Sequence, residues 1–576
     1  MQKSNFKDRL LSPGLLPVWL AVFAVIYYGL YYRCGYNLAD EGNVALLSKR
    51  LLDGERPFKD MAMGYNLFWF YPIVGLFAVF GPSLIVTKVY FFTLAAITAL
   101  LGYQCVAVAT RKPWLAFAVG LVLVIIPGTP FRTYIPFLAV SNSLMLVLVA
   151  ILSPTRPGYW VALLGGSLLL TLTFLIRVEI GMFFLLVWLG LAIFRVFDLE
   201  IKWLVKIPVF LATLLLPGTI TWFIHQPIYN HARSAGYGKE FVLQYTSYYR
   251  ILAKTLHFPE KKYKKIMKLP PGRTTNVLSI GKHDLGNLER RPLSDVWKYK
   301  RWSKRVFPLL TYLPFVTFGL LMAWMAGISV MKLRAGETHP ARDFLVTGVL
   351  IAGALTTFPQ FYFFRPDLGH LSEFMPGCIL ALACGGCFIA GKIRLSLNGT
   401  ALVAGVILGV LLLHIGLYIS YALPERYAGT IAARKGRNKL FQAENGVRVY
   451  VTPEEFDGLT AITKTIQSYS RHGDYVVCYP YAPGVNFMTN RPTYEYWLYV
   501  DNATHSLNWE SETIDRFREK KPAAIVISDW NINRNDASLF SHWAPQVKKF
   551  IDENYHNQGT YLKHTVYTRE TKPNAE

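Results

Sequence analysis

Asp40 and Glu41 are adjacent carboxylates in a polar stretch just behind the first long apolar run, Leu15 to Tyr32. Carboxylates are costly at a membrane surface unless they meet water, a cation or a substrate. A second group follows about 20 residues later in the stretch Gly54 to Asp60, which includes Lys59. Two acidic groups in the first loop of a many-span protein predict chemistry carried out at the membrane face.

Further pairs of a base with an acid lie between later apolar runs. One is Arg177 with Glu179, and another is Arg365 with Asp367 and His370. For any one of these sites the alternative is an ordinary charged side chain that reaches out to the membrane interface. Their recurrence on one face of the membrane favours a functional site.

The composition is that of a polytopic membrane protein with a water-soluble part, since 53% of the 576 residues are hydrophobic and the chain is also rich in charge after Tyr421. Runs long enough to cross about 30 Å of hydrocarbon recur through the first 420 residues. We predict about eleven spans, the first of them retained: 14–33, 84–107, 113–129, 135–152, 158–176, 180–197, 203–225, 306–331, 344–364, 372–391 and 398–421. The apolar run 66–80 is shorter, which predicts an interfacial or re-entrant helix.

Basic residues predict the orientation of these spans. With 66–80 outside the count and the N-terminus in the cytoplasm, the short cytoplasmic segments carry 14 Lys and Arg and the short outer loops carry three. The first loop raises the outer number to seven and keeps the sign of the bias. The loop 34–83, the loop 226–305 and the C-terminus are therefore expected outside, although a basic group just before the span 306–331 runs against the rule.

The loop 226–305 carries 18 Lys and Arg against five Asp and Glu. A basic surface beside a bilayer attracts lipid phosphates. Within it we expect one cluster to face the membrane and hold a lipid phosphate: Lys261, Lys262, Lys264 and Lys265. Nucleic acid is rejected as a partner, because no nucleic-acid-binding motif occurs and spans bracket the loop.

The chain divides into a transmembrane domain, 1–421, and a C-terminal soluble domain, 422–576, in which charges become frequent. Pro453 to Ser470 predicts a helix with acidic residues in its first turn. The runs 475–479 and 524–527 predict buried strands, and 561–568 predicts a closing strand of a small α/β domain. The predicted fold is thus an α-helical membrane protein with a C-terminal α/β domain.

The charged groups suit group transfer from a lipid phosphate. A sugar held on a polyprenyl phosphate needs Arg or Lys to neutralise the leaving phosphate, and the acceptor hydroxyl needs a carboxylate to take its proton. The order Asp-Glu, then Gly-x-x-Pro-Phe-x-Asp, then an apolar interfacial stretch resembles the GT-C glycosyltransferases, and in particular the dolichyl-phosphate-mannose–protein mannosyltransferase and aminoarabinose-transferase group. In that fold seven spans precede a large outer loop, as in the predicted topology.

The resemblance covers the first loop well and the rest in patches. It implies that Asp40 or Glu41 is the catalytic carboxylate, that Asp60 supports the loop or the acceptor, and that Lys59 and His370 contact substrate or phosphate, each with a simple structural alternative. The stretch 365–370 is similar to an Arg-x-Asp-x-x-His motif of bacterial members. The C-terminal run Thr489 to Pro492 resembles a segment in which glycine is usual at position 490.

The sequence therefore predicts an inverting, polyprenyl-phosphate-dependent hexosyl- or pentosyltransferase of a bacterial inner membrane and cell envelope, whose acceptor is a glycan, lipid or protein. A transporter or flippase is the first alternative, disfavoured because charges sit at span ends, with Lys88 and His414 as the nearest exceptions. A membrane-anchored protein that binds an envelope polymer is the second. Asp40, Glu41 and Glu179 could hold a divalent metal ion, but no ligand spacing requires one.

Overall fold

The computed structural model describes residues 12–63, 65–126, 130–198, 203–234, 302–334, 342–358, 368–392, 409–410, 412–417, 430–500, 508–529 and 539–569. The chain forms two compact units. One comprises Met1–Tyr31, Phe91–Asn230 and Arg290–Ala432, and the other comprises Tyr32–Tyr90, His231–Glu289 and Ala433–Glu576. The first loop, assigned from the sequence to the transmembrane domain, is thus grouped with the C-terminal domain.

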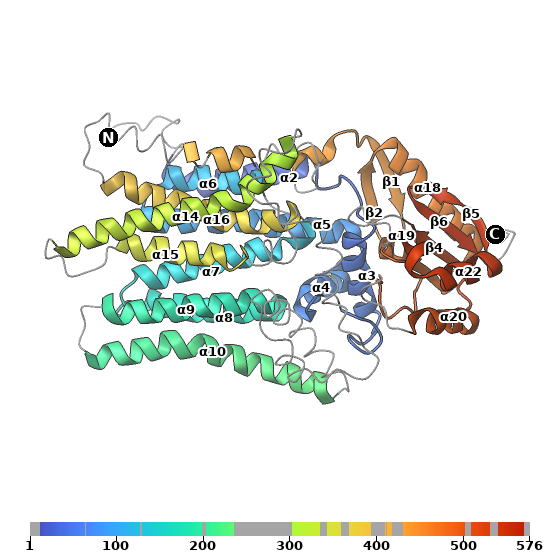
Figure 1. Ribbon diagram of the computed structural model, residues 1–576, viewed down its shortest axis with the longest axis horizontal. Helices are drawn as coiled ribbons and strands as arrows, with labels where there is room; N and C mark the ends of the chain where they lie inside the picture. The colour runs from blue at the N-terminus through green and yellow to red at the C-terminus, as the bar shows by residue number, and fades with distance from the viewer. Residues whose placement is uncertain are drawn as a thin grey trace. The chain divides into compact units, whose positions relative to one another are not determined.

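The first unit is helical, and Figure 1 shows several of its helices running side by side. Helix α7 packs against α8 and α15, α15 packs against α16, and α2 packs against α6. The described elements are η1 (Pro13–Leu15), α2 (Leu16–Gly29), α5 (Leu84–Thr110), α6 (Pro113–Ile125), η3 (Pro130–Arg132), α7 (Tyr134–Ile151), α8 (Pro157–Ile176), α9 (Val178–Asp198), α10 (Trp203–Ser234), α14 (Trp302–Arg334), α15 (Arg342–Leu355) and α16 (Leu368–Lys392). The division between the units falls within α5, between Tyr90 and Phe91.

Six helices of the described chain are long and apolar enough to cross a membrane: Leu84–Thr110, Tyr134–Ile151, Pro157–Ile176, Lys206–His231, Tyr312–Met331 and His370–Ala390. Four other predicted spans also coincide with helices, namely α2, α6, α9 and α15. The eleventh, 398–421, lies mostly outside the described residues. The count of eleven therefore stays a prediction.

The stretch predicted to lie in the interface forms η2 (Leu67–Trp69) and α4 (Tyr71–Phe80). Helix α4 has ten residues and so rises about 15 Å, half the thickness of a bilayer core. A helix this short cannot span, as the sequence predicted, while its position at the interface stays a prediction. It packs against α3 (Asp40–Leu52), the helix that begins with the acid pair.

The second unit also contains a four-stranded sheet in the order β3-β4-β6-β5. Strand β3 is parallel to β4, whereas β6 is antiparallel to both β4 and β5. The elements of the C-terminal part are η7 (Ile431–Arg434), β1 (Lys439–Ala443), β2 (Val447–Val451), α18 (Pro453–Tyr469), β3 (Val476–Tyr479), α19 (Pro483–Thr489), α20 (Trp509–Lys520), β4 (Ala524–Ser528), α21 (Phe540–Trp543), α22 (Pro545–Asn554), β5 (His556–Tyr561) and β6 (His564–Thr568).

Helices cover both faces of this sheet (Figure 1). On one face, Trp509 of α20 and Ile551 of α22 join a buried cluster with Tyr479 and Ile525 of the strands. On the other, α18 contacts β5 and β6 while α19 contacts β3. Every residue of β3 and β4 is buried. Because side chains alternate between the two faces of a strand, both faces of these strands are covered. Their continuous apolar runs are the reason the sequence predicted them.

Two features of this domain differ from the sequence prediction. The closing strand expected over 561–568 is confirmed only from His564 onward, as β6, because the chain turns at Leu562 and Lys563 and Tyr561 ends the other strand of the hairpin β5–β6. Both turn residues have positive φ, 51° and 68°, as a tight two-residue hairpin requires. The hairpin β1–β2 was not anticipated, although its Asn445-Gly446 turn is a strong local signal.

Candidate functional site

The acid pair begins helix α3. Asp40 and Glu41 are its first two residues, where the helix dipole favours negative charge. Asn37 organises this start: its side-chain oxygen accepts hydrogen bonds from the backbone N–H groups of Ala39 and Asp40, both 3.0 Å long. The backbone N–H of Asn37 also donates to Glu41 Oε2 at 3.1 Å. The two carboxylates are therefore held by a fixed turn.

The two acids lie in different surroundings. Glu41 is only 7% exposed, and its Oε1 is 2.7 Å from Nζ of Lys88, itself buried in the second turn of α5. Asp40 is half-buried and accepts hydrogen bonds from Asn37 Nδ2 at 3.2 Å and from the hydroxyl of Tyr499 at 3.3 Å. The geometry thus makes Glu41 one half of a buried ion pair and leaves Asp40 as the more accessible carboxylate.

The C-terminal domain supports this turn through α19. Gly42 of α3 lies against Gly484 of α19 so closely that a Cβ at Gly42 would overlap the Gly484 backbone. The Gly484 N–H donates to the Leu38 carbonyl at 2.7 Å, and the Tyr36 hydroxyl donates to the Gly484 carbonyl at 2.9 Å. A side chain at either glycine would push the acid pair away from α19.

The loop after α3 is held by Arg50, which the sequence analysis did not single out. Its guanidinium is buried, binds both oxygens of Glu55 at 2.5–2.9 Å, and donates to the carbonyl of Glu495 at 3.0 Å and to that of Asp60 at 3.3 Å. No motif in the sequence distinguishes it from the adjacent Lys49. Arg50 therefore ties the first loop to the C-terminal domain.

Asp60 and Lys59 differ in their contacts. The Asp60 carboxylate accepts from the backbone N–H of Arg56 at 2.8 Å and from the Arg56 guanidinium at 3.1 Å. These hydrogen bonds lower the pKa of Asp60. This places Asp60 as a support of its own loop, whereas the Lys59 ammonium is exposed.

The first unit contains a separate group of buried charges. Arg177 Nε lies 2.7 Å from Glu179 Oε1. Arg132 Nε lies 2.5 Å from Glu373 Oε1, and Arg132 Nη2 lies 2.7 Å from His370 Nε2. All five side chains are buried. Arg132 and Glu373 were not proposed from the sequence as site residues.

Each of these charges stands near the end of a helix. Arg177 and Glu179 occupy the junction of α8 and α9, and Glu373 lies in the second turn of α16. Buried charges are stable only when they are paired, and here two guanidiniums face two carboxylates. A phosphate that bound to these arginines would have to share them with Glu179 and Glu373.

Several predicted site residues lie outside the described residues: Arg365, Asp367, Lys261, Lys262, Lys264 and Lys265. Within the described part of the chain, no group of three or more His, Cys, Asp and Glu side chains could hold a metal ion. Glu41 and Glu179, considered as metal ligands from the sequence, each have a cationic partner instead.

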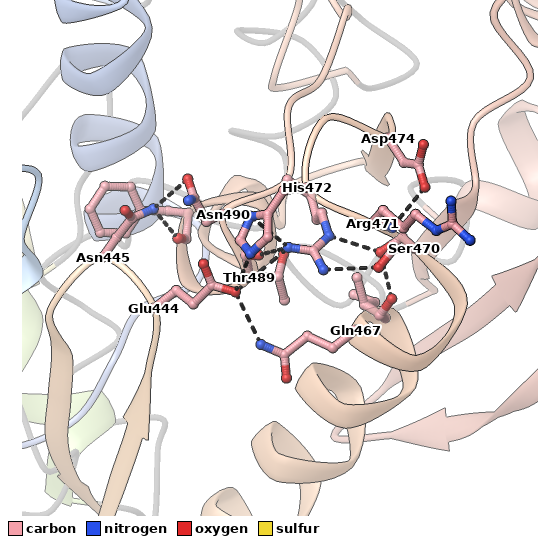
Figure 2. Close-up of polar contacts among 12 residues, drawn as sticks. Glu444, Asn445, Gln467, Ser470, Arg471, His472, Asp474, Thr489 and Asn490 are labelled. Carbon is pink, nitrogen blue, oxygen red and sulfur yellow. Dashed lines mark hydrogen bonds and ion pairs between the residues drawn. The ribbon is translucent and has the colours of Figure 1, made fainter. Parts of the chain in front are cut away.

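The C-terminal run Thr489 to Pro492 has a structural role. Asn490 adopts the left-handed conformation, with φ of 50°, which explains why glycine suits that position. Arg491 is buried and donates to Ser470 Oγ at 2.9 Å and to the carbonyls of Ser470 and Thr489 at 2.9 and 2.8 Å. Figure 2 shows this network together with Glu444 and His472, which also lie beside the guanidinium. The guanidinium joins the end of α18 to the end of α19.

Comparisons with known proteins give likenesses of fold only. No family model matches the chain, and no curated protein matches it. Among solved structures it is similar to the oligosaccharyltransferase AglB of Archaeoglobus fulgidus, determined with an inhibitory peptide and a dolichol-phosphate (12% identity, 98% of this chain and 75% of that one, TM-score 0.47). It is also similar to ArnT of Cupriavidus metallidurans bound to undecaprenyl phosphate (14% identity, 97% and 98%, TM-score 0.45).

Proposed function

We propose that this protein is an integral-membrane glycosyltransferase that moves a sugar from a polyprenyl-phosphate donor to an acceptor, with inversion at the anomeric carbon. The observation that carries the proposal is the contrast between the two neighbouring acids. Glu41 is buried and neutralised by Lys88, whereas Asp40 is half-buried and, among the described residues, accepts hydrogen bonds from the neutral donors Asn37 and Tyr499. A general base needs a carboxylate that is both fixed and reachable.

In the proposed reaction Asp40 takes the proton of the acceptor hydroxyl. The acceptor oxygen then forms a bond to the anomeric carbon of the sugar while the bond from that carbon to the phosphate oxygen breaks. The leaving lipid phosphate keeps the electron pair of the broken bond. Its charge requires cationic groups, because phosphate release is otherwise unfavourable.

For that phosphate we propose Lys59 and the lysine cluster of the loop 226–305. The exposure of Lys59 supports its assignment. Arg177 and His370, expected from the sequence to bind substrate, are paired instead with Glu179 and Arg132. The assignment of the lysine cluster rests on the sequence alone.

We place the reaction at the outer face of a bacterial inner membrane, with the C-terminal domain outside the cytoplasm. The support is the positive-inside bias of the short loops. A transporter is disfavoured in the described chain, since the buried charges of the first unit lie near helix ends and a transport site lies near the middle of the bilayer.

The test is transfer from labelled polyprenyl-phosphate sugars by the purified full-length protein, compared for the wild type and Asp40→Asn. This change keeps size and polarity but removes the proton acceptor, so turnover should fall by about 10²–10⁴-fold. The apparent KM for the lipid donor should stay close to that of the wild type. Transfer at the wild-type rate by Asp40→Asn would overturn the proposed base and move the polymer-binding alternative ahead.

A further inference from the structure

Aromatic side chains gather around Asp40 within the second unit. The hydroxyl of Tyr499 donates to Asp40 Oδ1 at 3.3 Å. The ring of Tyr481 stands edge-on to that of Tyr499, with centroids 5.5 Å apart and planes at 65°. Both rings are half-buried. The accessible acid thus lies beside two aromatic rings that also carry polar hydroxyl groups.

A third ring, Trp497, lies two residues before Tyr499 and is 44% exposed. The segment that carries it is well fixed. Tyr496 donates its hydroxyl to the Phe58 carbonyl at 3.0 Å, and its own carbonyl accepts from Ala62 N–H at 2.6 Å. The indole of Trp497 packs against Tyr496 with centroids 5.3 Å apart. These contacts show that Tyr496 connects the first loop to the C-terminal domain. They leave the Trp497 side chain partly exposed to solvent.

The separation of these rings sets the size of a ligand. The Cα atoms of Trp497 and Tyr499 are at most about 7 Å apart, so an oligosaccharide of a few sugar rings is long enough to reach both side chains. A sugar has apolar C–H faces and a rim of hydroxyl groups. Rigid aromatic rings with polar tips match both parts at a low cost in conformational entropy.

We propose that Tyr481, Tyr499 and Trp497 form the acceptor site, and that the acceptor is a carbohydrate. One sugar ring stacks on Trp497, and an acceptor hydroxyl is turned toward Asp40. This inference rests on the proposed function and makes it more specific, because the sequence left a glycan, a lipid and a protein open as acceptors. A membrane anchor would instead place Trp497 in the lipid interface; the hydrogen bond from its neighbour Tyr499 to the acid favours the carbohydrate.

The experiment measures binding of the detergent-purified full-length protein to a printed array of neutral and acidic oligosaccharides, with no lipid donor present. We expect the wild type to bind at least one oligosaccharide. Trp497→Ala should weaken that binding about tenfold or more, and Trp497→Phe should restore part of it. The matched control is Tyr450→Ala, since Tyr450 is 39% exposed in the same unit and should bind as the wild type does.

The inference would be overturned if the wild type bound no oligosaccharide, or if Trp497→Ala bound as well as the wild type. It would also be overturned if Trp497→Ala lost binding to phosphatidylglycerol vesicles instead, because the ring would then be a membrane anchor.

Asp40→Asn should keep oligosaccharide binding while losing transfer. Transfer onto a lipid or peptide without oligosaccharide binding would overturn only the acceptor assignment. Binding without use of any polyprenyl-phosphate sugar would overturn the proposed function and leave a carbohydrate-binding site.

Discussion

Glu41 and Lys88 form a buried pair in which each charge depends on the other. Their side chains are 9% and 5% exposed, and the Nζ–Oε1 distance is 2.7 Å. Loss of one partner leaves the other charge buried and uncompensated, which typically costs about 3–5 kcal/mol. The pair therefore holds the start of α3 against the start of α5. It contributes to activity by fixing the position of Asp40.

We predict that Glu41→Gln and Lys88→Met each lower the free energy of unfolding by several kcal/mol, and that the double variant loses much less than the sum. A double-mutant cycle of thermal unfolding measures this coupling. Asp40→Asn serves as the comparison, because it should lower turnover while leaving stability near that of the wild type. Additive losses for Glu41→Gln and Lys88→Met would show that the two charges do not depend on each other.

His564 gives the second unit a dependence on pH. It lies in β6 with Nδ1 2.6 Å from Ser528 Oγ, and burial lowers its pKa from 6.5 to about 4. At a pH between these two pKa values, the imidazole of His564 is protonated in the unfolded chain but not in the folded chain. The free energy of unfolding should therefore fall as the pH is lowered from 6.5 toward 4, by up to about 3 kcal/mol.

Thermal unfolding of the full-length protein as a function of pH measures this loss. The variant His564→Gln should show a flatter profile over the same window. His556→Gln is the control, because His556 is exposed on the neighbouring strand and should leave the profile unchanged. An unaltered profile for His564→Gln would assign the acid sensitivity to another group.

At the scale of elements, the contact between α3 and α19 positions the acid pair. The prediction is that Gly42→Ala forces these helices apart, because its methyl group would overlap the Gly484 backbone. Overpacking of this kind costs about 1–3 kcal/mol, and transfer should fall together with the melting temperature because Asp40 moves with α3.

Gly75→Ala in α4 is the matched control for Gly42→Ala, since a Cβ there meets nothing within 4 Å. In a helix interior alanine is favoured over glycine, so Gly75→Ala should be neutral or slightly stabilising. If Gly42→Ala matched this control in both stability and transfer, α3 and α19 would not need their close contact.

For the whole molecule the decisive property is the side of the membrane on which each unit lies. The charge bias of the short loops predicts that the C-terminal domain is outside the cytoplasm. Alkaline phosphatase fused to the C-terminus should then be active in cells, and green fluorescent protein fused there should be dark. The opposite result would reverse the orientation and with it the proposed outer-face reaction.

The sequence by itself determined the helices and much of the sheet. Apolar runs and their lengths are local properties, and they located ten predicted spans on helices, the short α4, and the strands β3 and β4. The helix predicted from Pro453 to Ser470 ends one residue earlier as α18 and begins with the capping box of Thr452 and Glu455. Strand β5, with the polar sequence HNQGTY, was missed because it lacks an apolar pattern.

Only the tertiary structure decided between the two acids. Glu41 meets Lys88 from 47 positions away, and Asp40 meets Tyr499 from 459 positions away. The lone lysine in an apolar helix was visible as an exception in the sequence, but its partner was not. Neighbouring carboxylates look alike in a sequence, because burial and charge pairing come from segments that only folding brings together. That is the physical reason why the acid pair could be located from the sequence while its division of roles could not.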